Sequence, residues 1–252
     1  MKKMLSAATA CLFLLFSTNV SAQFSKGSKF VEANFGNIGF NKSDSKGESG
    51  GSSSKSDNKG FSINLFPRVG YFITDNFAVG AEVDIYFYNN KGNFYNSAGV
   101  KSSDSKTTEV SLGVGPFVRY YFAGDNRSRF YGQVGGSIYG DLVYDVESRS
   151  YSGGNLFSTT KYDYKKKYNN LAGNVLVGWN RILAENVALN MSLGYRYSHT
   201  TYTYNYTTTP VIGSPATGPD YKYTNSNNSV TWNIGFTMFF PSKAGKAKKG
   251  KK

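Results

Sequence analysis

The sequence predicts an all-β protein, an eight-stranded antiparallel up-and-down transmembrane β-barrel with long extracellular loops and short periplasmic turns. Three observations predict this fold. Alternation of apolar with polar or small residues recurs over segments of about ten residues, which is the signal of a half-buried strand. The connections between segments alternate between long and short, as they do when the two rims of a barrel face different compartments. The polar faces carry charges, and the apolar faces carry aromatic residues near the strand ends.

The strands are justified in chain order by the residues on their apolar faces, because side chains alternate across a strand. The predicted strands are residues 30–40, 60–73, 77–88, 107–122, 129–139, 170–180, 187–197 and 229–240. The first four present Val31, Ala33 and Phe35; Ile63, Leu65, Val69 and Tyr71; Phe77, Val79, Val83 and Ile85; Val110, Leu112, Val114 and Val118. The last four present Phe130, Val134 and Ile138; Leu171, Val175, Val177 and Trp179; Leu189, Met191, Leu193 and Tyr195; Val230, Trp232, Ile234 and Phe236.

The second and third strands also predict a register. They flank the short sequence TDN, so a hairpin centred on Asp75 pairs them. This pairing places Val69 opposite Ala81 on the apolar face and Arg68 opposite Glu82 on the polar face.

The connections are of two kinds. TDN, AGDNRS and LAEN are short, whereas residues 41–59, 89–106, 141–169 and 198–228 are long and polar. The first long connection is rich in Gly and Ser and has no apolar anchor, so we expect it to be mobile. The last is rich in Tyr and Thr and is interpreted either as a protruding sheet that binds partners or as a solvated extension.

The two ends of the chain differ from the barrel in composition. Residues 1–22 combine a positive start, an apolar run and the small-residue site VSA, which predicts a secretory signal peptide cleaved after Ala22. Cys11, the only cysteine, lies in that run, so we expect no disulfide in the exported chain. Residues 23–240 are predicted to form the barrel, and the lysine-rich residues 241–252 a disordered periplasmic tail.

The positive charge belongs mostly to these ends. The whole chain has 29 basic and 16 acidic residues, a net charge of +13. Without two signal-peptide lysines and six tail lysines, residues 23–240 carry 21 basic and 16 acidic residues, or +5. A basic, tyrosine-rich chain is otherwise typical of nucleic-acid binding. Export and this distribution exclude nucleic acid as the expected partner.

The polar face is predicted to point into the barrel and the apolar face toward lipid. The interior of eight strands is narrow, and small residues with a few opposite charges fit it. These charges either line an ion path or neutralise one another in a plugged interior. The Arg68–Glu82 register favours the plugged interior. The predicted interior charge network is Glu32, Arg68, Glu82, Asp84, Glu109, Arg119 and Arg196.

Four segments resemble a known family: PRVGYFITDNFAVGAEV, GPFVRYYF, VALNMSLGYRY and TWNIGFTMFF. They are similar to the repeating segments of the outer-membrane β-barrel domain family. This group includes OmpA-type transmembrane domains, OmpX-like and OmpW-like proteins and "porin family" proteins of Gram-negative bacteria. The resemblance covers about residues 24–240 and implies an outer-membrane location. It also implies a carboxyl-terminal aromatic signal for the barrel assembly machinery, carried by Phe236, Met238 and Phe240.

The residues offer little for catalysis. His199 is the only histidine and follows Ser198, a pair that lipid-modifying barrels would use. Adjacent residues on a strand point to opposite faces, so we interpret His199 as a solvated histidine and assign no catalytic residue. No Cys or His cluster and no calcium-loop spacing occurs, so no metal or other cofactor is expected.

The sequence therefore predicts a non-enzymatic outer-membrane barrel with a largely plugged interior and a structural or surface-interaction role, such as adhesion or envelope integrity. A small porin-like channel for ions or small solutes is the alternative, and a lipid-modifying enzyme is a third. The expected partners are outer-membrane lipids and lipopolysaccharide, the barrel assembly machinery and a surface ligand of the extracellular loops. The barrel is expected to be a monomer.

Overall fold

The computed structural model describes residues 24–49, 52–125, 127–165 and 170–242. The predicted signal peptide and most of the lysine-rich tail lie outside the described residues. Among these residues, no helix has the length and hydropathy that crossing a membrane requires. The strands are β1 (Lys29–Ser49), β2 (Ser52–Phe72), β3 (Phe77–Tyr95), β4 (Lys101–Gly124), β5 (Ser128–Ser152), β6 (Asn155–Lys165), β7 (Asn170–Ala184), β8 (Val187–Pro210), β9 (Ala216–Thr217) and β10 (Tyr221–Phe240).

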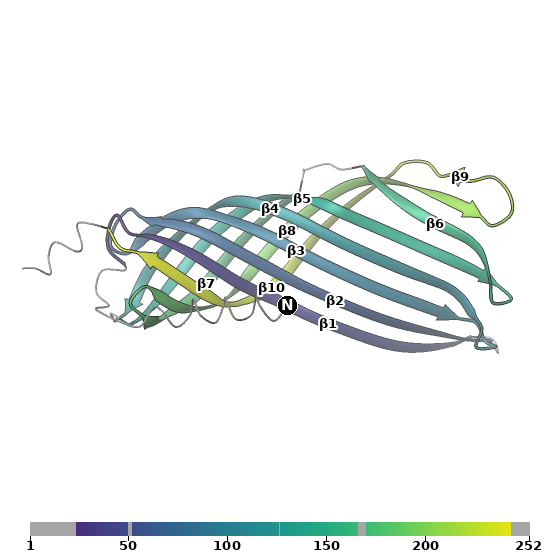
Figure 1. Cartoon of the computed structure of the whole chain (residues 1–252), viewed down its shortest axis with the longest axis horizontal. Coiled ribbons are helices and arrows are strands. Elements are labelled where there is room, and N and C mark those ends of the chain that lie inside the picture. Colours follow the sequence, from purple (N-terminus) through teal and green to yellow (C-terminus); the bar gives the residue numbers. More distant parts are fainter. Residues whose placement is uncertain (1–23, 50–51, 126, 166–169, 243–252) are drawn as a thin grey trace, which may run out of the picture.

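Eight of these strands close into an antiparallel ring. The order is β10-β1-β2-β3-β4-β5-β7-β8, and β8 pairs with β10 to close it. Figure 1 shows the strands tilted around an elongated body. The predicted eight-stranded barrel is confirmed. We call the end with the short turns after β2, β4 and β7 the turn end, and the opposite end the ribbon end.

The predicted register of the first short hairpin is confirmed. Arg68 lies opposite Glu82 and Val69 opposite Ala81 in the β2–β3 pair. The turn is held by the Thr74 hydroxyl, which accepts a hydrogen bond of 3.1 Å from the Phe77 N–H. Threonine and aspartate favour such turns because their side chains bond the backbone locally.

The first long connection differs from the expectation of a mobile segment. Residues 41–49 pair with residues 52–60 as far as Ser49 opposite Ser52, so the first connection is mostly a two-stranded ribbon. The third contains β6, which takes the place of β7 between β5 and β8 at the ribbon end. Backbone pairing needs no apolar face, so polar, low-complexity residues continue the strands where alternation in the sequence has stopped.

The ring is complete only in its turn-end part. Strands β1 and β10 pair from Lys29 opposite Phe240 to Gly36 opposite Asn233, where their pairing ends. Directly after this point, Asn37 has a φ of 48° and a β-bulge lies between Gly36 and Gly39. A bulge with a left-handed residue bends a strand, and here it turns β1 away from β10.

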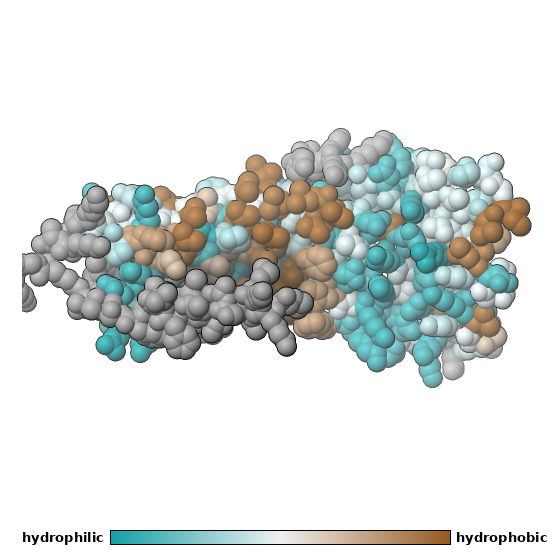
Figure 2. Space-filling model, in the orientation of Figure 1, coloured by the Kyte–Doolittle hydropathy of each residue, from teal (hydrophilic) through white to brown (hydrophobic). Residues whose placement is uncertain are grey.

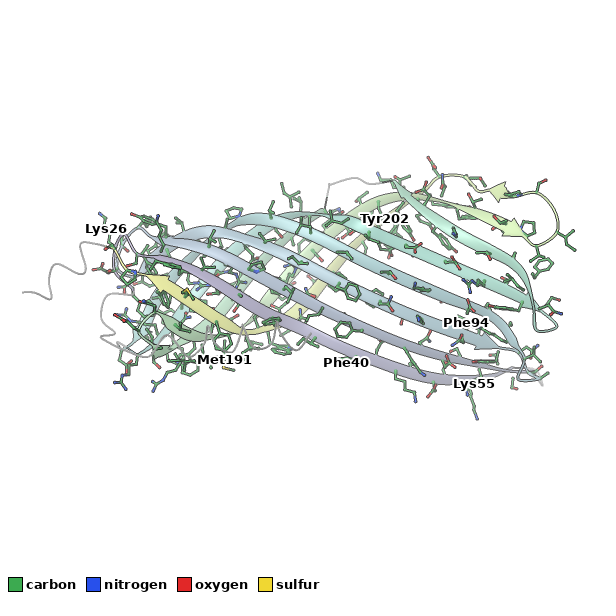
Figure 3. The ribbon with its side chains drawn as sticks, in the orientation of Figure 1. Lys26, Phe40, Lys55, Phe94, Met191 and Tyr202 are labelled. Atoms are coloured by element: carbon green, nitrogen blue, oxygen red, sulfur yellow. The ribbon has the colours of Figure 1, made fainter. Side chains whose placement is uncertain are left out.

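The distribution of apolar side chains is inverted relative to a soluble protein. Large apolar residues on the outer face are about half exposed, whereas charged residues on the inner face are buried. In Figure 2 the hydrophobic surface gathers over the turn-end part, and hydrophilic residues cover most of the ribbon end. In Figure 3, Met191 lies in the turn-end part and Lys55 near the ribbon end. We call the exposed set the apolar belt: Val31, Phe35, Val69, Tyr71, Val114, Val118, Tyr120, Phe130, Val134, Ile138, Val175, Val177, Met191, Leu193, Tyr195, Ile234, Phe236, Met238 and Phe240.

Candidate functional site

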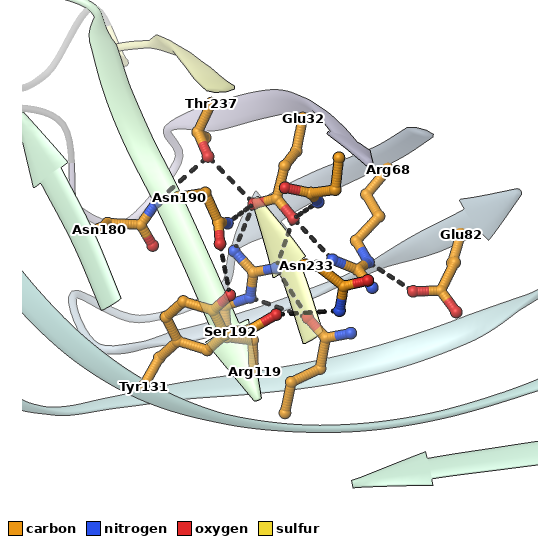
Figure 4. Close-up of polar contacts among 12 residues, drawn as sticks. Glu32, Arg68, Glu82, Arg119, Tyr131, Asn180, Asn190, Ser192, Asn233 and Thr237 are labelled. Atoms are coloured by element: carbon orange, nitrogen blue, oxygen red, sulfur yellow. Dashed lines mark hydrogen bonds and ion pairs between the residues drawn. The ribbon is translucent and has the colours of Figure 1, made fainter. Parts of the chain in front are cut away.

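A buried carboxylate stands at the centre of the barrel interior. Glu32 on β1 is 0% exposed and points inward, as even-numbered residues of β1 do. Its two oxygens accept hydrogen bonds from the guanidinium groups of Arg68 at 2.8 Å and Arg119 at 2.8 and 3.0 Å. Figure 4 shows the further donors converging on the same carboxylate. These are Asn34 at 2.5 Å, Asn190 at 2.6 Å and Thr237 at 3.0 Å.

The two arginines, Arg68 on β2 and Arg119 on β4, complete this network. Arg68 Nε also donates to Glu82, its cross-strand partner. Arg119 is 0% exposed, donates to Gln133 Oε1 at 3.0 and 2.7 Å, and lies 4.1 Å from the centre of the Tyr131 ring. The four charges balance, two carboxylates against two guanidiniums. Buried charges are stable only when they are paired and hydrogen-bonded, and these four side chains meet both conditions.

An aromatic layer closes the barrel on the turn-end side of these charges. Phe24, which precedes β1, folds into the barrel mouth and is only 7% exposed. Its ring centre lies 5.0 Å from that of Tyr121, 5.1 Å from Phe239 and 6.0 Å from Phe72. Phe30 lies 5.7 Å from Phe72 in the same layer. The charge network and the aromatic layer together fill the turn-end part of the narrow interior, one above the other.

The interior opens toward the ribbon end into a cavity of about 550 Å³, which we call the cup. Asp84 and Arg196 form an ion pair in its wall. Ser111 donates its hydroxyl toward Glu109 at 3.0 Å and toward Asp141 at 2.5 Å. The remaining lining is polar or aromatic: Asn37, Ser62, Asn64, Tyr86, Gly113, Tyr139, Tyr144, Ser198, Thr200, Tyr202, Tyr223, Asn225, Asn227 and Ser229.

A tyrosine cluster surrounds the mouth of the cup. The ring centres of Tyr144 and Tyr164 lie 4.1 Å apart, those of Tyr164 and Tyr202 5.4 Å, and those of Tyr202 and Tyr223 5.0 Å. Burial raises the pKa of Tyr164 to about 12, and the nearby Tyr202 acts in the same direction. Burial likewise raises the pKa of Tyr202 to about 12, with Tyr223 as the next cause. Both hydroxyls therefore stay protonated and neutral well above neutral pH.

The structure divides the predicted interior charges into three groups. Glu32, Arg68, Glu82 and Arg119 meet in one network, and Asp84 pairs separately with Arg196. Glu109 joins neither set and instead bonds Ser111 beside Asp141. Sequence reasoning missed Phe24, Asp141 and the amide donors. Phe24 falls before the first alternating segment, and Asp141 falls where the alternation of β5 fades.

Ser198 and His199 do not form a pair. Ser198 lines the cup, whereas His199 is half-exposed and bonds through Nδ1 to Ser226 Oγ at 2.9 Å. Ser226 lies opposite His199 in the β8–β10 ladder. Among the described residues, no group of three or more His, Cys, Asp or Glu could hold a metal ion.

Three residues of the predicted assembly signal lie on the apolar belt of β10. Phe236 is 52% exposed, Met238 41% and Phe240 49%. Their strand pairs with β1 on one side and β8 on the other, so it is the strand that closes the ring.

No protein-family model matches this chain, and no curated protein sequence matches it. It is similar in structure to the outer membrane protein OprG from Pseudomonas aeruginosa, with 17% identity over 88% of this chain and 100% of that one and a TM-score of 0.46. Neisserial surface protein A (NspA) is 18% identical over 85% of this chain and 100% of its own, with a TM-score of 0.36. The outer membrane protein AlkL is 15% identical over 90% of this chain and 97% of its own, also with a TM-score of 0.36. At these values, function has to be inferred from this chain's own residues.

Proposed function

We propose that this chain is an integral outer-membrane barrel of a Gram-negative bacterium with a plugged interior and a role at the cell surface. The apolar belt supports membrane insertion, because a large exposed apolar surface around buried charges is stable in lipid and costly in water. The closed ring supports it as well, since lipid requires every strand hydrogen bond to be satisfied within the protein. Outer-membrane lipids and lipopolysaccharide are then the groups that contact the belt.

The orientation follows from the two ends of the barrel. Both terminal strands, β1 and β10, have their outer ends at the turn end, which we assign to the periplasm. The long ribbons then project outward from the cell, which is the arrangement of bacterial barrels. Strand β10, with Phe236, Met238 and Phe240, serves as the segment read by the barrel assembly machinery.

The Glu32 network is the main observation that supports a surface role over a channel. A conducting pore needs water and mobile ions along its axis, whereas here the central carboxylate is 0% exposed and bonded on both oxygens. The aromatic layer behind it adds a second barrier. These two levels support a structural or surface-interaction role, such as adhesion or envelope integrity, over a channel. The ribbons carry polar residues that face solvent and are ordered by strand hydrogen bonds. They are therefore the part of the protein that would contact other surfaces.

Single-cysteine labelling tests insertion and orientation. Lys46→Cys lies on an exposed ribbon position and Ala123→Cys on an exposed turn-end position. A membrane-impermeant maleimide added to intact cells should label Lys46→Cys and should label Ala123→Cys only after the outer membrane is permeabilised. The wild-type chain controls for Cys11. Labelling of both variants in intact cells, or of Ala123→Cys alone, would contradict the proposed orientation.

A further inference from the structure

The wall of the cup contains a buried carboxylate with an unused oxygen. Asp84 is 5% exposed, and its Oδ2 is paired with Arg196. Its Oδ1 is buried and has no hydrogen-bond partner among the described residues. A buried carboxylate oxygen left without a donor is costly, so this atom marks a position where a ligand donor would bind.

Two further carboxylates line the cup without a counter-ion. No described lysine or arginine forms an ion pair with Glu109 or Asp141, and the Ser111 hydroxyl, with one proton, satisfies only one of them at a time. Among the described residues that line the cup, Arg196 is the only cationic one. Three carboxylates against one guanidinium give the described lining of the cup a formal net charge of −2, inside a chain whose formal net charge is +13.

Strand register separates Asp84, at the floor of the cup, from Asp141 and Glu109, which meet at Ser111 nearer its mouth. Asp84 lies opposite Gly113 on β4, and Asp141 lies opposite Ser111, two residues further along the same strand. Glu109 is two residues beyond Ser111. At ~3.4 Å per residue, Asp141 lies about 7 Å above the level of Asp84. The Glu109 carboxylate reaches the same Ser111 hydroxyl as Asp141, so these two carboxylates lie together.

An aromatic residue lies at the strand level of each carboxylate. Tyr139 lies opposite Gly113 at the level of Asp84, Tyr86 opposite Ser111 at the level of Asp141, and Tyr144 opposite Glu109. All three line the cup. Tyrosine faces attract cations and also accept methylene groups, so each level offers an anion beside an aromatic surface.

We propose that the cup binds a linear polyamine, an organic cation whose ammonium groups are separated by short methylene chains. Its ammonium groups would bond Glu109, Asp141 and Asp84 Oδ1, and its methylene segments would lie against Tyr86 and Tyr144. A neutral sugar would leave the formal charge of −2 uncompensated, and among the described residues no group of three or more His, Cys, Asp or Glu could hold a metal ion. The proposal rests on the proposed function, because the plugged interior makes the cup a site that opens only to the exterior.

Calorimetric titration of spermidine into the full chain, purified in detergent micelles, tests this proposal. The expected result is saturable binding that weakens with added salt, because the attraction is between charges. Glu109→Gln and Asp141→Asn should each weaken binding about tenfold, since each removes one charge-assisted hydrogen bond. Asp44→Asn removes the same charge from an exposed ribbon position and should leave the affinity unchanged. Butylamine, with one ammonium group, should bind at least about tenfold more weakly than spermidine.

Binding that is absent in the wild-type chain at millimolar spermidine, or unchanged in the Glu109→Gln/Asp141→Asn double variant, would overturn the proposal. Heat-modifiable gel mobility of each variant establishes that the barrel is folded, and Tyr144→Leu, which retains all carboxylates, provides a second measure with an expected loss of affinity. The result is separable from the proposed function. Conductance together with intact binding would overturn only the plugged interior, whereas an insulating barrel without binding would overturn only the polyamine site.

Discussion

Arg119 on β4 and Glu32 on β1 form a two-pronged ion pair in the barrel interior, with N–O distances of 2.8 and 3.0 Å and both side chains fully buried. The two strands are not neighbours in the ring, because β2 and β3 lie between them. The pair therefore spans the lumen rather than one hairpin. A cross-lumen contact of this kind fixes the barrel's cross-section and blocks its axis at the same time.

Glu32→Gln should destabilise the barrel by about 3–5 kcal/mol, because it leaves the two arginines buried with less than their compensating charge. The loss is measurable by urea unfolding in detergent micelles, followed by the fluorescence of Trp179 and Trp232. The matched control is Asp44→Asn, whose ion pair with Lys42 is exposed at both side chains and should not affect the midpoint. An unchanged midpoint for Glu32→Gln would show that the network contributes nothing to stability.

Phe24→Ala should lower the unfolding free energy by about 3–5 kcal/mol, the cost of removing a packed aromatic ring. Phe24 contacts Phe72, Tyr121 and Phe239 at the barrel mouth, so its loss leaves a cavity in that layer. Phe157→Ala, at a ribbon position that is 62% exposed, should cost far less in the same urea titration. Equal losses from the two variants would contradict a packing role for Phe24.

Gly115→Ala should reduce the folded fraction sharply, because a Cβ at this position would lie 1.7 Å from the backbone oxygen of Gly136 on the neighbouring strand. The backbone cannot rotate away as a side chain can, so β4 and β5 would have to separate. Gly132→Ala is the matched control on β5, since apart from its chain neighbours no atom of the described residues would lie within 4 Å of an added Cβ. Heat-modifiable gel mobility should show a folded Gly132→Ala barrel and a mostly unfolded Gly115→Ala chain.

In an alkaline titration followed by absorbance at 295 nm, a fraction of the tyrosines should ionise only at high pH. Tyr164 and Tyr202 ionise at a pKa of about 12 in the folded chain, above the ordinary value of 10. A pKa raised by folding contributes stability that is fully present below about pH 10 and lost as the pH rises through about 12. Replacing both residues by phenylalanine should remove part of that late fraction, and a late fraction of unchanged size would place the perturbed tyrosines elsewhere.

The eight-stranded ring was predictable because it depends on a pattern of period two. Each strand in this barrel has one face toward the polar interior and one face in the apolar belt. The faces of Val69 and Arg68 can therefore be predicted from their residue types alone, before their neighbours in the fold are known. The register of β2 and β3 was predictable for the same reason, since three turn residues fix it.

The centre of the network was not predictable in detail. Thr237 and Glu32 are separated by 205 residues, and their contact forms only when β10 closes on β1. The sequence indicates that Glu32 faces inward but not which donors reach it. The ribbon of the first long connection escaped prediction for a different reason: both of its faces are polar, so its pairing leaves no alternation to detect.

Single-channel recording in planar bilayers tests the plugged interior most directly. The wild-type chain should insert and show no stable openings, because Glu32, Arg68 and Arg119 bridge the lumen and the aromatic layer around Phe24 closes the turn end. Stable openings of the wild-type protein, with a conductance that changes in Arg68→Ala or Glu82→Ala, would contradict this account and assign the interior charges to an ion path.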